Sequence, residues 1–323
     1  MTPSTASEEI RVLEISRYTT PAEGVRELEL VQHDGKPLPV WEPGAHVDLI
    51  LREGLVRQYS LCGDPSDRSR LRIAVLREPR GRGGSAIVHD QLGEGNQVEV
   101  RGTTSTHPGT FVSFRRRWHW HHPGLPMLAA ASSTGAQVEL HYGGRTRGSM
   151  AYAETLLATY GDRVTIYPAD KAGLLPVKDL LSTLSEQALV YACGPEPLLH
   201  ALEDASVELP PDTLHIERFH PRDGAGPLSP ADADPFLAEL ASSGAVHAVP
   251  PDRSVLSVLQ EVGAPVLSSC TQGACGTCET GVLDGEVDHR DSLLTPEERD
   301  ANDVMFVCVS RAAHGCHRLV LDL

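Results

Sequence analysis

The sequence has no long apolar run and no recognisable N-terminal leader. No segment reaches the roughly 18 consecutive apolar residues of a membrane-spanning helix, so no membrane association is expected. The first residues, MTPSTASEEIRV, carry neither a basic head nor an apolar stretch, and they do not resemble a signal peptide. Together these absences predict a cytoplasmic protein.

Positive charge is also scarce. The chain has 28 Lys and Arg against 44 Asp and Glu, which gives a formal net charge of −16. Because nucleic-acid binding requires a basic face that neutralises phosphates, this balance argues against a nucleic-acid partner. It permits steering toward a basic protein surface, although plain solubility explains an acidic surface equally well.

The seven cysteines are odd in number, which argues against a disulfide framework. Four of them follow the spacing C-x4-C-x2-C-x29-C: Cys270, Cys275, Cys278 and Cys308. Thiolates at this plant-type ferredoxin spacing hold a [2Fe–2S] cluster. Zinc sites usually pair two Cys-x-x-Cys units, and this chain has one. The sequence therefore predicts an iron–sulfur cluster, with structural zinc as the alternative.

The 323 residues leave room for two or three domains. Residues 10–101 hold short alternating apolar segments between turn signals, which predict an antiparallel β-barrel. From residue 125 onward, helical and strand-like segments alternate, which predicts a doubly wound parallel α/β sheet. A Pro- and Gly-rich stretch at 221–235 is typical of a linker. The expected domains are a flavin barrel at 1–106, a nucleotide-binding α/β domain at 107–225 and an α+β ferredoxin domain of the β-grasp class at 236–323.

The barrel segment carries a string suited to a flavin, Arg57-Gln58-Tyr59-Ser60. An arginine can bind a phosphate through two hydrogen bonds, a tyrosine ring can pack on the isoalloxazine, and a serine hydroxyl can reach its redox nitrogen. Downstream, Gly83-Gly84 lets backbone amides approach a phosphate. By itself, an Arg-x-Tyr-Ser string is a weak signal.

The order of the motifs resembles the phthalate dioxygenase reductase family, and within it the vanillate O-demethylase reductases. That order is Arg-x-Tyr-Ser, Gly-Gly-Ser, an α/β unit with YACGP at 191–195, and the ferredoxin loop. The resemblance covers nearly the whole chain. It implies an NADH-dependent oxidoreductase that binds FMN in the barrel, NADH in the middle domain and a [2Fe–2S] cluster at the C-terminus. The implied partner is a Rieske-type aromatic-ring oxygenase or demethylase.

The same resemblance implies individual contacts, and it assigns no catalytic acid, base or nucleophile. The FMN contacts are Arg57, Tyr59, Ser60, Gly84 and Ser85. The NADH contacts are Arg145, Cys193, Gly194 and Pro195. Phe219 is expected to cover the flavin ring, with a core aromatic as the alternative.

One stretch departs from the family pattern. Where the family has an apolar strand and then Gly-Gly-Ile-Gly-Ile-Thr-Pro, this chain has RRRWHWHHPG at 115–124. Its histidines form no coherent metal-ligand set, and one basic patch in so acidic a chain is a poor nucleic-acid site. A shift of one base in the codons permits the family sequence. We therefore hypothesise two compensating indels that bracket this stretch.

Segment 103–124 is thus anomalous as written. A glycine-rich turn at the head of a helix presents backbone amides to a pyrophosphate, and Trp and His side chains replace that turn here. We expect weak or absent NADH binding, with Thr110–Phe114 as a substitute strand. The alternative to a working reductase is therefore a disabled one, which binds FMN and a cluster but accepts few electrons from NADH.

Overall fold

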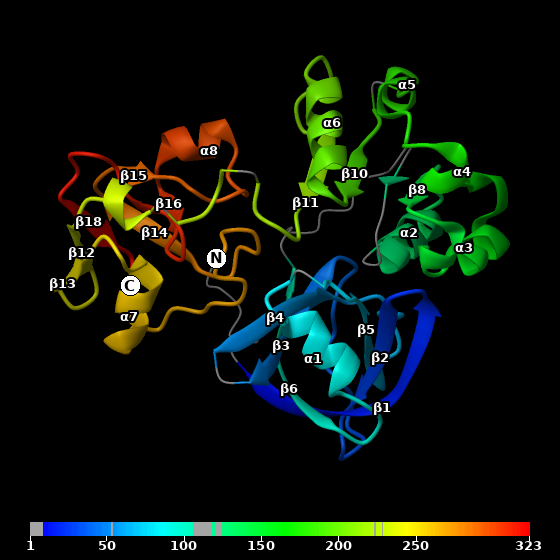
Figure 1. Cartoon of the computed structure of the whole chain (residues 1–323), viewed down its shortest axis with the longest axis horizontal. Coiled ribbons are helices and arrows are strands. Elements are labelled where there is room, and N and C mark those ends of the chain that lie inside the picture. The colour runs from blue at the N-terminus through cyan, green and yellow to red at the C-terminus, as the bar shows by residue number, and fades with distance from the viewer. Residues whose placement is uncertain are drawn as a thin grey trace. The chain divides into compact units, whose positions relative to one another are not determined.

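The structure is a computed structural model of the chain (Figure 1). It describes residues 9–52, 54–79, 81–105, 118–119, 124–185, 187–222, 224–227 and 229–323. Two compact units divide between Glu217 and Arg218. In these described ranges, no helix has both the length and the apolar character needed to cross a bilayer.

The first sheet of unit 1 is antiparallel, with six strands in the order β4-β3-β6-β1-β2-β5 (Figure 1). The strands are β1 (Ile10–Ala22), β2 (Val25–Val31), β3 (Ala45–Arg52), β4 (Leu55–Ser60), β5 (Arg70–Leu76) and β6 (Gln97–Ser105). Leu61, directly after β4, forms an isolated bridge with Ile73 of β5. Because this bridge joins the two outer strands, the sheet closes, and the expected antiparallel barrel is confirmed.

Alternation of apolar and polar residues produces the barrel. In β5, Leu71, Ile73 and Val75 are buried, while the residues between them are partly exposed. Side chains from all six strands meet in one core, and each fully buried Leu, Ile or Val contributes roughly 1.5–3 kcal/mol to that core. Helix α1 (Gly84–Asp90), between β5 and β6, adds Val88 to the same core.

The second sheet of unit 1 has five strands in the order β11-β10-β7-β8-β9, and all its pairings are parallel. The strands are β7 (Trp118–His119), β8 (Leu140–Gly144), β9 (Val164–Pro168), β10 (Val190–Cys193) and β11 (Leu214–Glu217). The helices between them are α2 (Gly124–Ser133), α3 (Ala153–Tyr160), α4 (Ala169–Ala172), α5 (Val177–Ser182) and α6 (Glu196–Ser206), with short 3-10 turns η2 (Arg147–Ser149) and η3 (Gly161–Arg163).

The strand order of this sheet reverses at β7. From β7 the chain adds β8 and β9 on one side, and then β10 and β11 on the other. The carboxyl ends of β7 and β10 therefore flank a topological switch point, where doubly wound sheets bind their ligands. The predicted doubly wound fold is confirmed.

The central strand β7 comes from the anomalous stretch. The backbone of Trp118–His119 pairs with Tyr191–Ala192 of β10 and with Leu140–His141 of β8. The expected substitute strand, Thr110–Phe114, lies outside the described residues. Trp118 and His119 thus supply the strand between β8 and β10.

Unit 2 contains a five-stranded mixed sheet in the order β13-β12-β18-β14-β16. Its strands are β12 (Phe236–Leu240), β13 (Ala245–Val249), β14 (Glu279–Asp284), β16 (Val304–Phe306) and β18 (Arg318–Leu321). A second small sheet pairs β15 (Val287–Asp288) with β17 (Arg311–Ala312), and the helices are α7 (Val255–Glu261), α8 (Pro296–Ala301) and the 3-10 turn η4 (Pro230–Asp232).

Helix α7 packs across this sheet. Its Leu256 and Leu259 join the core that Ala238 and Leu319 form from the adjacent parallel strands β12 and β18. The helix begins at Ser254, whose hydroxyl accepts the Ser257 N–H at 3.1 Å. The mixed sheet and its crossing helix confirm the expected β-grasp ferredoxin fold.

Candidate functional site

Three of the predicted cluster ligands lie in one loop between α7 and β14, and the fourth follows β16. The loop holds Cys270, Cys275 and Cys278, and Cys308 lies two residues after the end of β16. The Val307 N–H donates to the Cys278 carbonyl at 3.3 Å. This bond ties the segment of Cys308 to the end of the loop, so residues far apart in the sequence share one site.

Contacts between sulfurs link the four cysteines in pairs: Cys275 with Cys270, Cys270 with Cys308, and Cys308 with Cys278. Hydrogen bonds from the Cys275 and Cys308 thiols lower the pKa of Cys270, and the same bonds raise the pKa of the two donors. Cys308 also bonds to Cys278. A low pKa favours the thiolate, which is the form that binds metal.

Backbone amides point at two of these sulfurs. The Gln272 N–H donates to Cys270 Sγ at 3.3 Å, and the Cys270 N–H donates to Cys275 Sγ at 3.5 Å. Such donors stabilise negative charge on cluster sulfurs. Four convergent thiols with amide donors are a ligand set that fits a [2Fe–2S] cluster.

A mononuclear metal site fits less well. Within the residues that the structure describes, no group of three or more His, Cys, Asp or Glu side chains is arranged to hold one metal ion. Tetrahedral zinc needs four ligands around a single point. A two-iron cluster divides its four cysteines between two metal atoms, so a wider arrangement is compatible with it.

The loop requires glycine at Gly273. Its φ is +68°, and a Cβ there would lie 2.6 Å from Val309 Cγ2 and 3.0 Å from Asp291 Cα. The Gly273 carbonyl also accepts the Ser292 N–H at 2.9 Å. The loop therefore packs directly on the segment that contains Asp291.

In the barrel, the structure brings Arg57 onto the predicted glycine turn. A Cβ at Gly84 would lie 2.6 Å from Arg57 Cγ and 2.9 Å from its Nε. The guanidinium donates to the carbonyls of Val56 at 2.7 Å and Arg82 at 3.1 Å. The Arg-x-Tyr-Ser motif and the Gly-Gly-Ser turn thus meet, with the Arg57 guanidinium between them.

The other predicted flavin residues, Tyr59, Ser60 and Ser85, make different contacts in the structure. Tyr59 packs against the barrel core, and burial raises its pKa to about 12. Ser60 is half-buried and pairs in register with His46 of β3. The Ser85 hydroxyl accepts the Glu78 N–H at 3.0 Å and so closes the turn before α1. The sequence does not predict this bond.

The predicted nicotinamide residues lie at the carboxyl edge of the parallel sheet. Cys193 ends β10 and is buried, and Gly194 and Pro195 lead into α6. Arg145 is exposed and directly follows β8. Phe219 belongs to unit 2, and its side chain is 44% exposed.

Sequence reasoning missed one contact, between His46 and Glu217. His46 is 3% exposed on β3, and its Nε2 bonds to the carboxylate of Glu217 at the end of β11. Glu217 is in register with Cys193. The pair therefore joins the barrel to the parallel sheet beside residues assigned to both cofactors, and no local pattern identifies two partners so distant in sequence.

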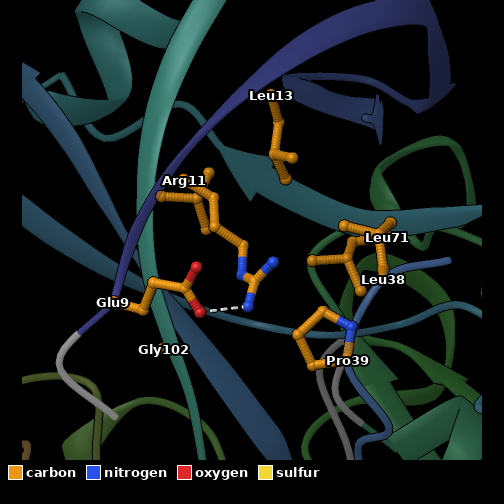
Figure 2. A pocket seen from close by; sticks show the side chains of 8 residues that line it. Glu9, Arg11, Leu13, Leu38, Pro39, Leu71 and Gly102 are labelled. Atoms are coloured by element: carbon orange, nitrogen blue, oxygen red, sulfur yellow. Dashed lines mark hydrogen bonds and ion pairs between the residues drawn. The ribbon is translucent and has the colours of Figure 1, made fainter. Parts of the chain in front are cut away.

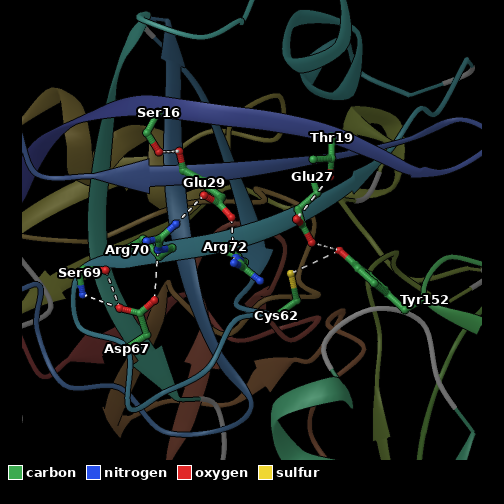
Figure 3. A network of polar contacts seen from close by, with 10 residues as sticks. All are labelled: Ser16, Thr19, Glu27, Glu29, Cys62, Asp67, Ser69, Arg70, Arg72 and Tyr152. Carbon is green, nitrogen blue, oxygen red and sulfur yellow. Dashed lines mark hydrogen bonds and ion pairs between the residues drawn. The ribbon is translucent and has the colours of Figure 1, made fainter. Parts of the chain in front are cut away.

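A second contact between the barrel and the α/β part of unit 1 involves Tyr152, which precedes α3 (Figure 3). Its hydroxyl donates to Glu27 and lies 3.9 Å from Cys62 Sγ. Tyr152 has a φ of +59°, which is unusual for a residue with a side chain. The left-handed backbone at the start of α3 directs the ring toward the barrel. Cys62 is buried in this contact.

A hollow on the barrel is too small for a cofactor (Figure 2). It measures about 20 Å³ and lies between Leu13, Leu38 and Leu71, with the Glu9–Arg11 ion pair at its rim. That volume holds about one water molecule. It is lined by none of the predicted site residues.

Comparison with known proteins accords with this arrangement. Residues 239–313 match the family model described as a 2Fe-2S iron-sulfur cluster binding domain. The toluene-4-sulfonate monooxygenase system reductase subunit of Comamonas testosteroni is 38% identical, over 94% of this chain and 95% of its own.

Two solved structures extend the likeness to the whole fold. Phthalate dioxygenase reductase superposes with a TM-score of 0.70 at 32% identity, over 97% of this chain and 98% of its own. An intact type IV self-sufficient cytochrome P450 monooxygenase superposes with a TM-score of 0.86 at 35% identity, over all of this chain, which spans 43% of that larger protein. The chain therefore belongs to the phthalate dioxygenase reductase family, oxidoreductases that pass electrons from a pyridine nucleotide through a flavin to a [2Fe–2S] centre.

Proposed function

We propose that this chain is the reductase component of an aromatic-ring oxygenase or demethylase system of the Rieske type. It would take electrons from NADH, carry them through FMN and the cluster, and deliver them to the separate oxygenase. The observation that carries the proposal is the convergence of four thiols in a ferredoxin unit that follows a barrel and a doubly wound sheet.

The proposed ligands of the cluster are Cys270, Cys275, Cys278 and Cys308. Their thiolates bind iron, and the amide donors of the loop stabilise the negative charge of the sulfurs. The cysteine side chains are half-buried or buried, which limits the access of water and of competing thiols to the centre.

The proposed FMN site lies at the corner that Arg57 and Gly84 form. Arg57 would bind the phosphate through charge-assisted hydrogen bonds, and Tyr59 and Ser60 would contact the ring. Ser85 would act indirectly, because its hydroxyl holds the turn at Glu78. A bound flavin supplies a centre that accepts a hydride and releases single electrons.

The proposed NADH site is the switch point of the parallel sheet. Cys193, Gly194 and Pro195 would lie beside the nicotinamide, and Arg145 would bind on the same edge. Phe219 would cover the flavin ring, since its exposed side chain is available for such a contact. The proposed domains are 1–106 for FMN, 107–225 for NADH and 236–323 for the cluster.

The proposed partner presents a basic surface. Residues 236–323 carry 13 acidic and 5 basic side chains, a net charge of −8. Complementary charge accelerates the encounter of two proteins and orients it. A cytoplasmic location, where thiols stay reduced, completes the proposal.

A cytochrome P450 is the second candidate acceptor. The superposition on the reductase-like part of a self-sufficient P450, at a TM-score of 0.86, favours it specifically. The two candidates differ in the protein that restores turnover. Reduction of a purified Rieske oxygenase supports the first, and reduction of a P450 alone supports the second.

The cluster assignment is tested by Cys308→Ser with Cys316→Ser as its control. Cys316 is a free cysteine of the same unit outside the motif. After anaerobic reconstitution with iron and sulfide, we expect Cys316→Ser to keep the visible absorption and the paramagnetic signal of a reduced [2Fe–2S] centre, and Cys308→Ser to lose most of both. A full signal in Cys308→Ser would overturn the ligand set.

A further inference from the structure

A buried aspartate packs against the cysteine loop and belongs to neither the ligand set nor the flavin site. The side chain of Asp291 is 0% exposed. A Cβ at Gly273 would lie 3.0 Å from Asp291 Cα and 3.3 Å from its Cβ. Since Gly273 stands between the ligands Cys270 and Cys275, Asp291 adjoins the part of the loop that carries the thiolates.

The carboxylate is held in place by backbone amides. Oδ1 accepts the N–H groups of Leu293 at 2.9 Å and Leu294 at 2.8 Å. Oδ2 has no hydrogen-bond partner in the described part of the chain. The charge is therefore fixed in orientation by the fold, although only half of its acceptor capacity is used.

The neutralisation of this charge is weak. Arg299 forms an ion pair with Asp291 at 3.9 Å, and its guanidinium donates at 2.8 Å to the backbone carbonyl of Asp291 rather than to the carboxylate. Arg299 is one-third exposed, so water screens it. Burial lowers the pKa of nearby His289, which disfavours the charged form of that imidazole.

We propose that Asp291 is a positioning residue whose buried charge lowers the reduction potential of the [2Fe–2S] cluster. Reduction adds one electron to the cluster, and hence one negative charge beside a fixed negative charge in a region of low dielectric constant. The carboxylate therefore disfavours the reduced form and makes the centre a stronger donor to its acceptor. The inference rests on the proposed function, because it requires the cluster.

The test is a potentiometric titration of the reconstituted full chain, followed by its paramagnetic signal. Asp291→Asn keeps the Oδ1 acceptor for Leu293 and Leu294 and removes the charge. We expect the equilibrium constant for one-electron reduction to rise about tenfold, which corresponds to ~59 mV. Arg299→Gln removes the counter-ion and should lower the constant, by about threefold because Arg299 is partly exposed.

Asp284→Asn is the matched control, since Asp284 is exposed at the far end of β14. It should leave the potential unchanged. An unshifted potential in Asp291→Asn, with an intact signal, would overturn the inference and leave Asp291 as a backbone cap. If Asp291→Asn fails to assemble a cluster, Asp291→Ser decides, because a serine hydroxyl can accept from the same amides without a charge: a raised potential supports the inference and an unchanged one overturns it. A wild-type chain with no cluster would refute the proposed function, and this inference with it.

Discussion

At the scale of single residues, the site depends on two glycines that have no room for a Cβ atom. Gly84 leaves room for Arg57, and Gly273 leaves room for Val309 and Asp291. Both glycines lie inside motifs that the sequence identifies, but the atoms that would collide with a side chain come from distant segments. The sequence motif identifies the glycine, and the contact with a distant segment explains why no larger residue fits there.

Gly273→Ala should disrupt the cysteine loop. The new Cβ would meet Val309 Cγ2 at 2.6 Å in a backbone with φ of +68°, which combines overpacking with left-handed strain. We expect unit 2 to lose about 2–5 kcal/mol of unfolding free energy and much of its iron and sulfide. Urea unfolding and metal analysis measure the two effects.

Gly263→Ala is the control for that substitution. Gly263 has a φ of +74°, and no atom lies within 4 Å of the position that a Cβ would take there. Alanine at this position therefore has the strain of the left-handed backbone but no steric clash. It should lose about 1–2 kcal/mol and retain its iron. Equal iron loss in both variants would contradict the role given to the contact with Val309.

Alkaline pH should destabilise unit 1. Burial raises the pKa of Cys62 from 9.0 and of Tyr59 from 10.0, each to about 12. Both groups stay neutral in the fold but ionise in the unfolded chain, so their contribution is complete below pH 9 and is lost as pH rises toward 12. Each contributes a slope of about 1.4 kcal/mol per pH unit within its own window.

Cys62→Ala and Tyr59→Phe measure these contributions. Each should reduce the fall in unfolding free energy between pH 9 and pH 11, as followed by denaturant unfolding at several pH values. The dependence of unfolding free energy on pH should depart from that of wild type above pH 9 in the Cys62 variant, and only above about pH 10 in the Tyr59 variant. Parallel curves for all three proteins would show that neither group is shifted.

At the scale of secondary-structure elements, unit 1 is held together by contacts between its barrel and its α/β part. The His46–Glu217 pair joins β3 to β11, and Tyr152 at the start of α3 reaches Glu27 on β2. A backbone bond from the Glu23 N–H to the Gly148 carbonyl, at 2.9 Å, adds a third link. These links orient the carboxyl edge of the parallel sheet relative to the barrel.

The His46–Glu217 pair should show energetic coupling. His46→Ala removes the bond, and Glu217→Gln replaces its charged acceptor with a neutral amide beside a buried imidazole, so each should cost about 1–3 kcal/mol of stability. The double variant should cost little more than either single one. A double-mutant cycle by urea unfolding measures a coupling of about 1–2 kcal/mol, since Glu217 retains 27% exposure.

The exposed pair His33–Glu14, at 3.4 Å with His33 82% exposed, is the matched control. Its cycle, through His33→Ala and Glu14→Gln, should show no resolvable coupling, because water screens an exposed pair. Additive effects at His46 and Glu217 would instead mean that the two side chains stabilise the fold independently.

At the scale of the whole molecule, a barrel, a parallel sheet and a ferredoxin unit follow one another along the chain, and one stretch departs from the sequence expected for the family. The ferredoxin unit and the barrel keep their motifs, whereas the head of the first nucleotide-domain helix carries RRRWHWHHPG. Its backbone still supplies the central strand β7. The fold of the parallel sheet therefore persists where the glycine turn expected for pyrophosphate is replaced.

The stretch at 117–123 should slow the transfer of electrons from NADH without abolishing it, so dithionite should reduce the chain faster than NADH does. Replacing 117–123 by Gly-Gly-Ile-Gly-Ile-Thr-Pro restores a turn whose amides can meet a pyrophosphate, and we expect bleaching by NADH to accelerate at least about 100-fold. Stopped-flow absorbance records both reactions, and the dithionite rate of the two proteins should match. Rapid bleaching by NADH in a chain whose mass confirms its sequence would contradict this expectation.

The sequence by itself determined the order of the domains, the four cysteines and the flavin motif. These features depend on the spacing of residues and on the alternation of apolar and polar residues, which can be recognised within a short segment of sequence. Only the tertiary structure decided that His46 meets Glu217, that Arg57 covers Gly84 and that Asp291 lies buried against Gly273. Those contacts join segments that are distant along the chain, and their identity depends on strand order and register, which no local pattern of side chains specifies.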